Sequence, residues 1–236
     1  RGADVHAGYY TDPRGVGEVE PPLVLRPAST QDMSEIMKIC HAAGQPVTVQ
    51  GGLTGLVMAA RPQEGEIVIS LERMNQIEDI DPAAGTLTVQ AGTPLQVVQE
   101  AADAHDMVYP LDLGARGSCR IGGNLSTNAG GNRVIRYGMT RNWVAGMKVV
   151  TGTGELLELN RDLIKNATGY DFRHLFIGAE GTLGFVVEAT MRLDRAPKNL
   201  TAMVLGTPDF DSIMPVLHAF QNKLDLTAFE FFSDKA

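Results

Sequence analysis

The sequence predicts an α+β fold, because strand-like and helix-like hydrophobic patterns alternate along most of its 236 residues. A central stretch, residues 110–138, keeps neither pattern and contains seven glycines, which predicts a functional loop inside a compact domain. After Pro197 the alternation begins again, and this restart predicts a second unit. We therefore divide the chain into an N-terminal segment (1–16), a main domain (17–196) and the truncated beginning of a further domain (197–236).

The first elements have clear boundary signals. Residues 23–25 read as a short strand closed by Pro27. Ser29, followed three residues later by Asp32, predicts the start of a helix through a variant of the capping box. Gly44 predicts the end of that helix.

Further strands are predicted at 47–49, 67–71, 77–80, 86–90, 143–150, 155–159 and 185–193. The turns at 81–85 and 151–154 predict that the strands on either side of each form a hairpin. Thr93 and Pro94 predict a second helix, with the threonine as its cap. Beyond Pro197, we expect a strand near 201–205, a helix near 209–222 and a strand near 226–232.

The composition limits the kinds of molecule that this protein is expected to bind. A hydrophobic content of 44% with 20% charged residues is that of an ordinary globular protein. The net charge of −8 argues against nucleic acid and against anionic membrane surfaces. No apolar run approaches the length that spans a bilayer. Cys40 and Cys119 lie far apart in sequence and are expected to be reduced thiols, so we expect a cytoplasmic protein.

Two shorter glycine clusters accompany the central stretch. Residues 50–56 (QGGLTGL) follow a strand, and residues 178–184 (GAEGTLG) precede one. Successive backbone amides in such turns form a concave site for anions. The chain contains neither GxGxxG after a strand nor a Gly-Lys pair, which excludes the Rossmann fingerprint and the P-loop. Three glycine-rich segments with few basic residues predict one extended ligand held mainly by backbone.

These motifs resemble a known family. Residues 50–56 are similar to the phosphate-binding loop of FAD-binding domains of the vanillyl-alcohol oxidase and p-cresol methylhydroxylase (PCMH) type. GSCRIGGNLSTNAGG (117–131) and IKNATGYDFRHLFIGAEGTLG (164–184) resemble its D-2-hydroxyglutarate dehydrogenase and D-lactate dehydrogenase branch. The resemblance runs from about Pro22 to Arg195. It implies a two-subdomain PCMH-type FAD-binding domain, followed by the start of an α+β cap domain.

The resemblance also implies which residues hold FAD. Gly51, Gly52, Thr54 and Gly55 would wrap the diphosphate, and Val186 would contact the adenosine side through its backbone. The full expected cofactor-binding set is Gln50, Gly51, Gly52, Leu53, Thr54, Gly55, Leu56, Pro110, Leu111, Gly114, Ser118, Gly122, Gly123, Asn124, Thr127, Asn128, Gly130, Gly131, Gly138, Glu180, Gly181, Gly184 and Val186. Of these, Pro110, Leu111 and Val186 could instead be core residues.

Relatives that attach FAD covalently have a histidine where this chain has Leu53, so the resemblance implies dissociable, non-covalent FAD. It further implies oxidation of a D-2-hydroxy acid to the 2-oxo acid, by hydride transfer from C2 to flavin N5. The electron acceptor would be a quinone, an electron-transfer flavoprotein or a cytochrome, and a homodimer is left open.

No catalytic residue is identified in this chain, which alone is expected to be inactive. The resemblance places the carboxylate-binding cations, a base histidine and any divalent metal site in a C-terminal part beyond it. The five histidines here show neither HxxH nor HExxH spacing. Asp171 and Arg173 fit a packing turn better than a catalytic pair. Cys119 would lie close to the flavin but fits a small buried thiol better.

Some alternatives stay open. Arg116, Arg120, Arg133 and Arg136 surround the glycine-rich stretch, and each either counters the diphosphate charge or lies on the surface. The chain could be a non-catalytic FAD-binding fragment. It could also belong to a nucleotide-sugar enolpyruvyl reductase that shares the FAD domain.

Overall fold

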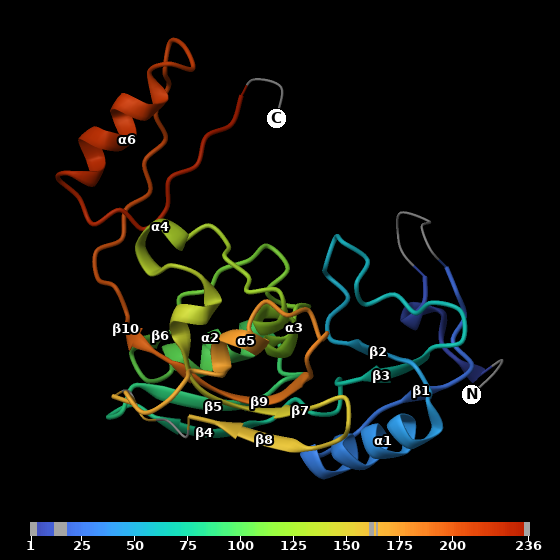
Figure 1. Cartoon of the computed structure of the whole chain (residues 1–236). Helices are drawn as coiled ribbons and strands as arrows, with labels where there is room; N and C mark the ends of the chain where they lie inside the picture. The colour runs from blue at the N-terminus through green and yellow to red at the C-terminus, as the bar shows by residue number, and fades with distance from the viewer. Residues whose placement is uncertain (1–3, 12–17, 161–162, 164, 234–236) are drawn as a thin grey trace.

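The computed structural model describes residues 4–11, 18–160, 163 and 165–233, so residues 1–3 and 12–16 of the N-terminal segment lie outside it. Two main sheets lie side by side, with helices packed around them and a C-terminal segment projecting from the body (Figure 1). The predicted α+β class with two subdomains is confirmed.

The first sheet is parallel and has the order β1–β3–β2. Its strands are β1 (Val24–Leu25), β3 (Ile67–Ser70) and β2 (Val47–Gln50), with Thr48 beside Val68. All four residues of β3 are buried, as expected for the central strand of a sheet covered on both faces.

Helix α1 (Thr30–Ala43) connects β1 to β2 and has the predicted ends. The Ser29 hydroxyl accepts a hydrogen bond from the Asp32 amide (3.0 Å). The Asp32 carboxylate accepts one in return from the amide of Ala28 (2.9 Å). Gly44 ends the helix in the left-handed region, at φ 62°. The variant capping box is therefore confirmed, with one difference: the Asp32 carboxylate bonds to the amide of Ala28, the residue before the cap residue Ser29.

The second sheet is antiparallel, with the order β4–β5–β9–β7–β8. Its strands are β4 (Ile77–Asp81), β5 (Thr86–Gln90), β9 (Phe185–Arg192), β7 (Val144–Val150) and β8 (Leu156–Leu159). Both predicted hairpins are confirmed, and β9 inserts between them by pairing with β5 and β7.

Helix α2 (Leu95–Asp103) follows β5 and buries Leu95, Val98 and Ala102. The prediction that Thr93 caps it is wrong: Pro94 is the cap residue and makes no side-chain cap bond. The Thr93 hydroxyl instead donates to the carbonyl of Gln76 (3.3 Å), because this fully buried side chain satisfies its polar atom across the fold.

The central stretch is not wholly irregular, which corrects the prediction. It contains the short helices α3 (Ile121–Ser126) and α4 (Val134–Tyr137), followed by η3 (Thr140–Trp143). Helix α3 forms because Ile121 and Leu125 are completely buried, a tertiary effect that overrides two poor helix formers, Gly122 and Gly123. The remaining short elements are η2 (Ala7–Tyr9), α5 (Arg173–Phe176), and β6 (Met107–Val108) paired with β10 (Asp194–Arg195).

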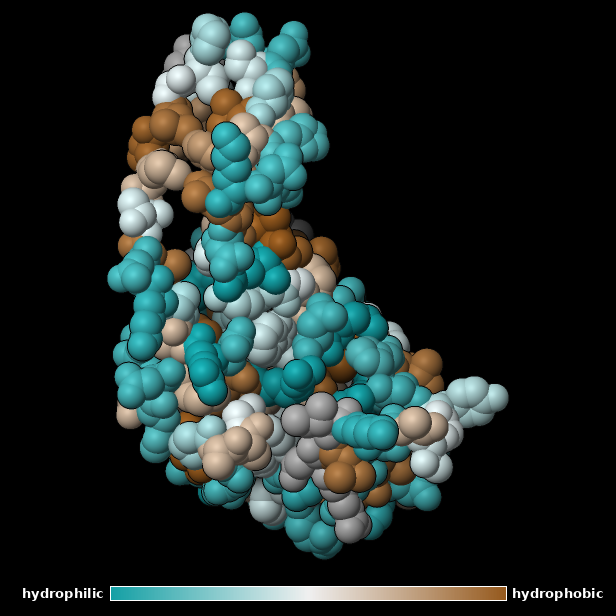
Figure 2. Space-filling view, turned by 90° about the vertical axis from the view of Figure 1, so that its left-hand side faces the viewer, coloured by the Kyte–Doolittle hydropathy of each residue, from teal (hydrophilic) through white to brown (hydrophobic). Residues whose placement is uncertain are grey.

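The C-terminal segment contains α6 (Ile213–Gln221), as predicted. The strands predicted near 201–205 and 226–232 are wrong, because both stretches are irregular. A strand needs a neighbour for its backbone groups, and the described residues provide no such neighbour here. Large hydrophobic side chains gather on this projecting segment (Figure 2), and Val204, Phe210 and Phe232 are each more than two-thirds exposed. Among the described helices, none is both long and apolar enough to cross a membrane.

Candidate cofactor-binding site

A cavity of about 290 Å³ lies between the two sheets. Three segments line it: the turn after β2, the stretch that leads into and forms α3, and the loop before β9. These segments are the three glycine-rich clusters of the sequence, so chain regions more than a hundred residues apart meet at one site.

About half of the expected cofactor-binding residues line this cavity. They are Gly51, Gly52, Leu53, Thr54, Gly55, Gly122, Gly123, Asn124, Thr127, Glu180, Gly181 and Val186. The others lie outside its lining: Gln50, Leu56, Pro110, Leu111, Gly114, Ser118, Asn128, Gly130, Gly131, Gly138 and Gly184. For this second set, a direct role at the cofactor stays a prediction.

Several of the expected residues that lie outside the cavity lining have a structural role instead. The Gln50 amide group donates to the carbonyls of Tyr9 (2.7 Å) and Ala60 (2.8 Å), which ties both ends of the turn region together. Leu111 is buried in the hydrophobic core, which is the alternative considered for it. Gly131 passes so close to Asp112 that an added Cβ would lie 1.9 Å from its carbonyl oxygen.

The cavity is also lined by residues outside the expected cofactor-binding set. They are Val49, Val57, Met58, Ala59, Ala60, Arg61, Leu71, Leu113, Cys119, Arg120, Ser126, Ala129 and Phe185. Most are apolar and carry no motif, because they line the cavity only through the tertiary fold. Cys119 and Arg120 are exceptions, because the family resemblance placed Cys119 close to the flavin, and Arg120 was considered as a counter-charge to the diphosphate.

Two of the glycines that line the cavity lie so close to neighbouring parts of the protein that no side chain fits. A Cβ added to Gly52 would lie 2.0 Å from the Ser118 carbonyl oxygen, so only glycine fits where the turn meets the segment before α3. A Cβ added to Gly122 would lie 2.8 Å from the Cβ of Ala91, so α3 packs directly on the end of β5. Gly123 differs, because nothing lies within 4 Å of its Cβ position.

The cavity suits a long ligand that carries both polar and apolar parts. The side-chain oxygen of Asn124 is buried and has no hydrogen-bond partner among the described residues, although this residue lines the cavity. A buried polar atom without a partner is rare and indicates a group that the site is built to receive. Apolar lining from Val49, Leu71 and Phe185 adds surface for a flat ring system.

Cys119 lies in the cavity wall but is only 3% exposed. Burial raises the pKa of its thiol, and a hydrogen bond donated by the side-chain NH2 group of Asn124 offsets part of this shift. Burial likewise raises the pKa of the completely buried Tyr109. Both groups are therefore uncharged near neutral pH, and a small buried thiol describes Cys119 better than a reactive nucleophile.

Asp171 and Arg173 form a structural clasp. The Arg173 guanidinium holds both carboxylate oxygens of Asp171, at 2.9 and 2.6 Å, and donates to the carbonyls of Val144 and Ala145. The Arg173 hydrogen bond lowers the pKa of Asp171, and Arg173 and His174 add their charge. The clasp fixes the start of α5 to the start of β7, which agrees with a packing turn.

The histidines do not meet at the cavity. His174 lies between Arg141 (3.2 Å) and Asp171 (3.4 Å) at the surface. Among the described residues, no group of three or more histidine, cysteine, aspartate or glutamate side chains could hold a metal ion.

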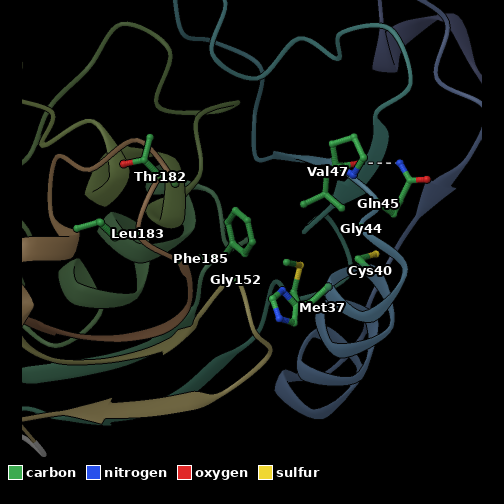
Figure 3. A pocket seen from close by; sticks show the side chains of 13 residues that line it. Met37, Cys40, Gly44, Gln45, Val47, Gly152, Thr182, Leu183 and Phe185 are labelled. Carbon is green, nitrogen blue, oxygen red and sulfur yellow. Dashed lines mark hydrogen bonds between the residues drawn. The ribbon is translucent and has the colours of Figure 1, made fainter.

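A second cavity of about 340 Å³ adjoins the first (Figure 3). It lies between the end of α1, which contributes Met37 and Cys40 to its lining, and the loop before β9. Gly181 and Phe185 line both cavities, so this loop separates two neighbouring hollows in the same crevice. An extended molecule bound along the loop can therefore contact both.

Comparison with known proteins agrees with this geometry. Residues 21–160 match the family model described as "FAD binding domain". D-2-hydroxyglutarate dehydrogenase of Stutzerimonas stutzeri is 61% identical over 92% of this chain and 47% of its own length. The enzyme of that name from Xanthomonas citri pv. viticola is 54% identical over 92% of this chain and 46% of its own length.

A solved structure of alkyldihydroxyacetonephosphate synthase aligns with a TM-score of 0.69 and 25% identity, over 78% of this chain and 34% of that one. The chain spans about half the length of the curated relatives it matches. FAD fits the features of this cavity: walls lined by glycine, the unpartnered side-chain oxygen of Asn124, and the apolar lining of Val49, Leu71 and Phe185. The match to the family model extends over more than half of the sequence. The chain belongs to the FAD-binding domain family, and its cofactor is FAD.

Proposed function

We propose that this chain is the cofactor-binding part of an FAD-dependent dehydrogenase that oxidises a D-2-hydroxy acid, preferably D-2-hydroxyglutarate, to the 2-oxo acid. The observation that carries the proposal is the 61% identity to a D-2-hydroxyglutarate dehydrogenase, which extends over 92% of this chain. Because the chain spans about half of that relative, the activity is proposed for the longer protein.

FAD supplies the two-electron acceptor when it is bound. The residues that line the cavity would bind and orient it: the glycine turn, α3 and the loop before β9 enclose the space that it would occupy, and the close packing of Gly52 on Ser118 holds two of these segments together. Within the described residues, Cys119 and Tyr109 are kept uncharged by burial, and neither suits the task of taking the hydroxyl proton of the substrate. The base and the groups that bind the substrate carboxylates are therefore proposed to lie outside this chain.

Both other functions considered from the sequence are less well supported. The high identity to named dehydrogenases favours that activity over an enolpyruvyl reductase. A non-catalytic FAD-binding role remains our proposal for the isolated chain only, since no catalytic group has been identified in it.

The electron acceptor, the oligomeric state and the cellular location are also proposals. A quinone, an electron-transfer flavoprotein or a cytochrome would reoxidise the flavin, and the protein would form a homodimer. A cytoplasmic location is consistent with two buried free thiols.

The substrate is tested anaerobically with the full-length protein. A panel of D- and L-2-hydroxy acids is mixed with the FAD-loaded enzyme while flavin absorbance is followed. We expect D-acids to bleach the flavin, with D-2-hydroxyglutarate fastest and the isolated chain unresponsive. Bleaching by L-acids alone, or none by any hydroxy acid, would contradict the proposal.

A further inference from the structure

Four arginines surround the glycine-rich stretch, and three of them have carboxylate partners. Arg116 and Arg133 pair with Asp112, at 3.6 and 3.0 Å. Arg136 pairs with Asp225 at 3.2 Å. Arg120 is different, since no carboxylate of the described residues lies within ion-pairing distance of it.

Arg120 lies in the wall of the FAD cavity, directly beside the glycine turn. A Cβ added to Gly51 would touch the Cβ and Cγ of Arg120, at 3.4 and 3.6 Å. The Nε atom of Arg120 is completely shielded from solvent, and it has no acceptor among the described residues. A guanidinium N–H without solvent or a partner is costly, and it predicts an acceptor that arrives with the ligand.

Glu72 is a nearby carboxylate, but its hydrogen bonds go elsewhere. Tyr9 and Arg26 donate to the same oxygen of Glu72, at 2.8 and 2.9 Å. Burial acts to raise the pKa of Glu72, yet those two bonds, with smaller contributions from the charges of Arg26 and Arg120, bring it below its usual value. The field of Arg120 therefore reaches this carboxylate, while its guanidinium remains without a direct partner.

FAD carries its negative charge on the diphosphate. The turn at Gly51–Gly55 presents consecutive backbone groups to the cavity, and Arg120 adds a cation at the same place. We propose that Arg120 is the cation that pairs with the FAD diphosphate, whereas Arg116, Arg133 and Arg136 stabilise the protein surface. This inference rests on FAD as the cofactor and goes beyond it by assigning a binding residue.

The test compares FAD affinity of the full-length protein with that of Arg120→Gln, Arg120→Met and Arg120→Lys, by quenching of flavin fluorescence at several salt concentrations. Arg116→Gln is the matched control, since Arg116 lies in the same stretch but is paired with Asp112. The Gln and Met variants should bind FAD roughly 10- to 100-fold more weakly, as expected for loss of a charge-assisted contact. They should also lose much of the salt dependence. The Lys variant should keep most of the affinity, and the control all of it.

Thermal unfolding of the cofactor-free proteins separates binding from folding. Because Nε of Arg120 has no partner without FAD, the Gln and Met variants should unfold within about 1 °C of the unmodified protein. Unchanged FAD affinity in both variants, or destabilisation of the cofactor-free fold that accounts for the weaker binding, would overturn the proposal. Failure of the unmodified protein to bind FAD would instead contradict the cofactor assignment.

Discussion

At the scale of single residues, Gly52 is the most constrained position of the site. The change Gly52→Ala would place a Cβ 2.0 Å from the Ser118 carbonyl oxygen, so the turn or the segment before α3 must move. We expect the cofactor-free protein to lose about 1–3 kcal/mol of stability, measured by urea unfolding. FAD binding should weaken as well, because both displaced segments line the cavity.

Gly123→Ala is the matched change, because nothing lies within 4 Å of its Cβ position although the residue lines the cavity. Its stability without cofactor should not fall and should rise by up to about 1 kcal/mol, because alanine is the better helix former within α3, while FAD affinity falls. Equal stability losses in the two variants would contradict the close approach at Gly52.

The Asp171–Arg173 clasp predicts a pH-dependent contribution to stability. The pKa of Asp171 is lowered in the folded protein by Arg173, so the clasp stabilises the fold at pH values above the unfolded pKa, about 3.9. That stability is lost as the pH falls through the lower, folded pKa. The difference between the unmodified protein and Asp171→Asn should therefore persist from pH 6 to 5 and close below about pH 4, measured by urea unfolding. A difference that grows on acidification would contradict this sign.

At the scale of elements, the capping box of α1 decides where the first helix begins. Ser29→Ala removes the acceptor for the Asp32 amide and should cost about 1 kcal/mol of stability. Ser29→Asp supplies another acceptor and should restore most of it. Thermal unfolding of the three proteins checks this, and equal melting temperatures would contradict the cap.

Elements with strong local signals were predictable. The helix between Ser29 and Gly44 and the strands of both hairpins follow from caps, turns and periodicity within short windows. Helix α3 was not predictable, because its two glycines disfavour a helix and burial of Ile121 and Leu125 decides the outcome. The strand patterns at 201–205 and 226–232 gave wrong predictions because a strand also depends on a neighbour.

At the scale of the whole molecule, two sheets of different type enclose one crevice (Figure 1). Sequence motifs predicted that the three glycine-rich segments meet, since one extended ligand explained all three. The apolar lining at Val49, Leu71 and Phe185 was not predictable, because ordinary core and lining residues look alike until the strands are placed. The partners of Arg133 and Arg136 were likewise set by the tertiary fold, and the pairing of its three neighbours singled out Arg120.

The central claim is that these three segments enclose FAD between the sheets. Amide hydrogen exchange, measured by mass spectrometry on the folded protein with and without FAD, tests it most directly. The account predicts that FAD slows exchange together in residues 51–55, 120–127 and 180–186, with little change in β4 and β8. Folded protein that takes up no FAD, or protection that falls outside these three segments, would contradict the account.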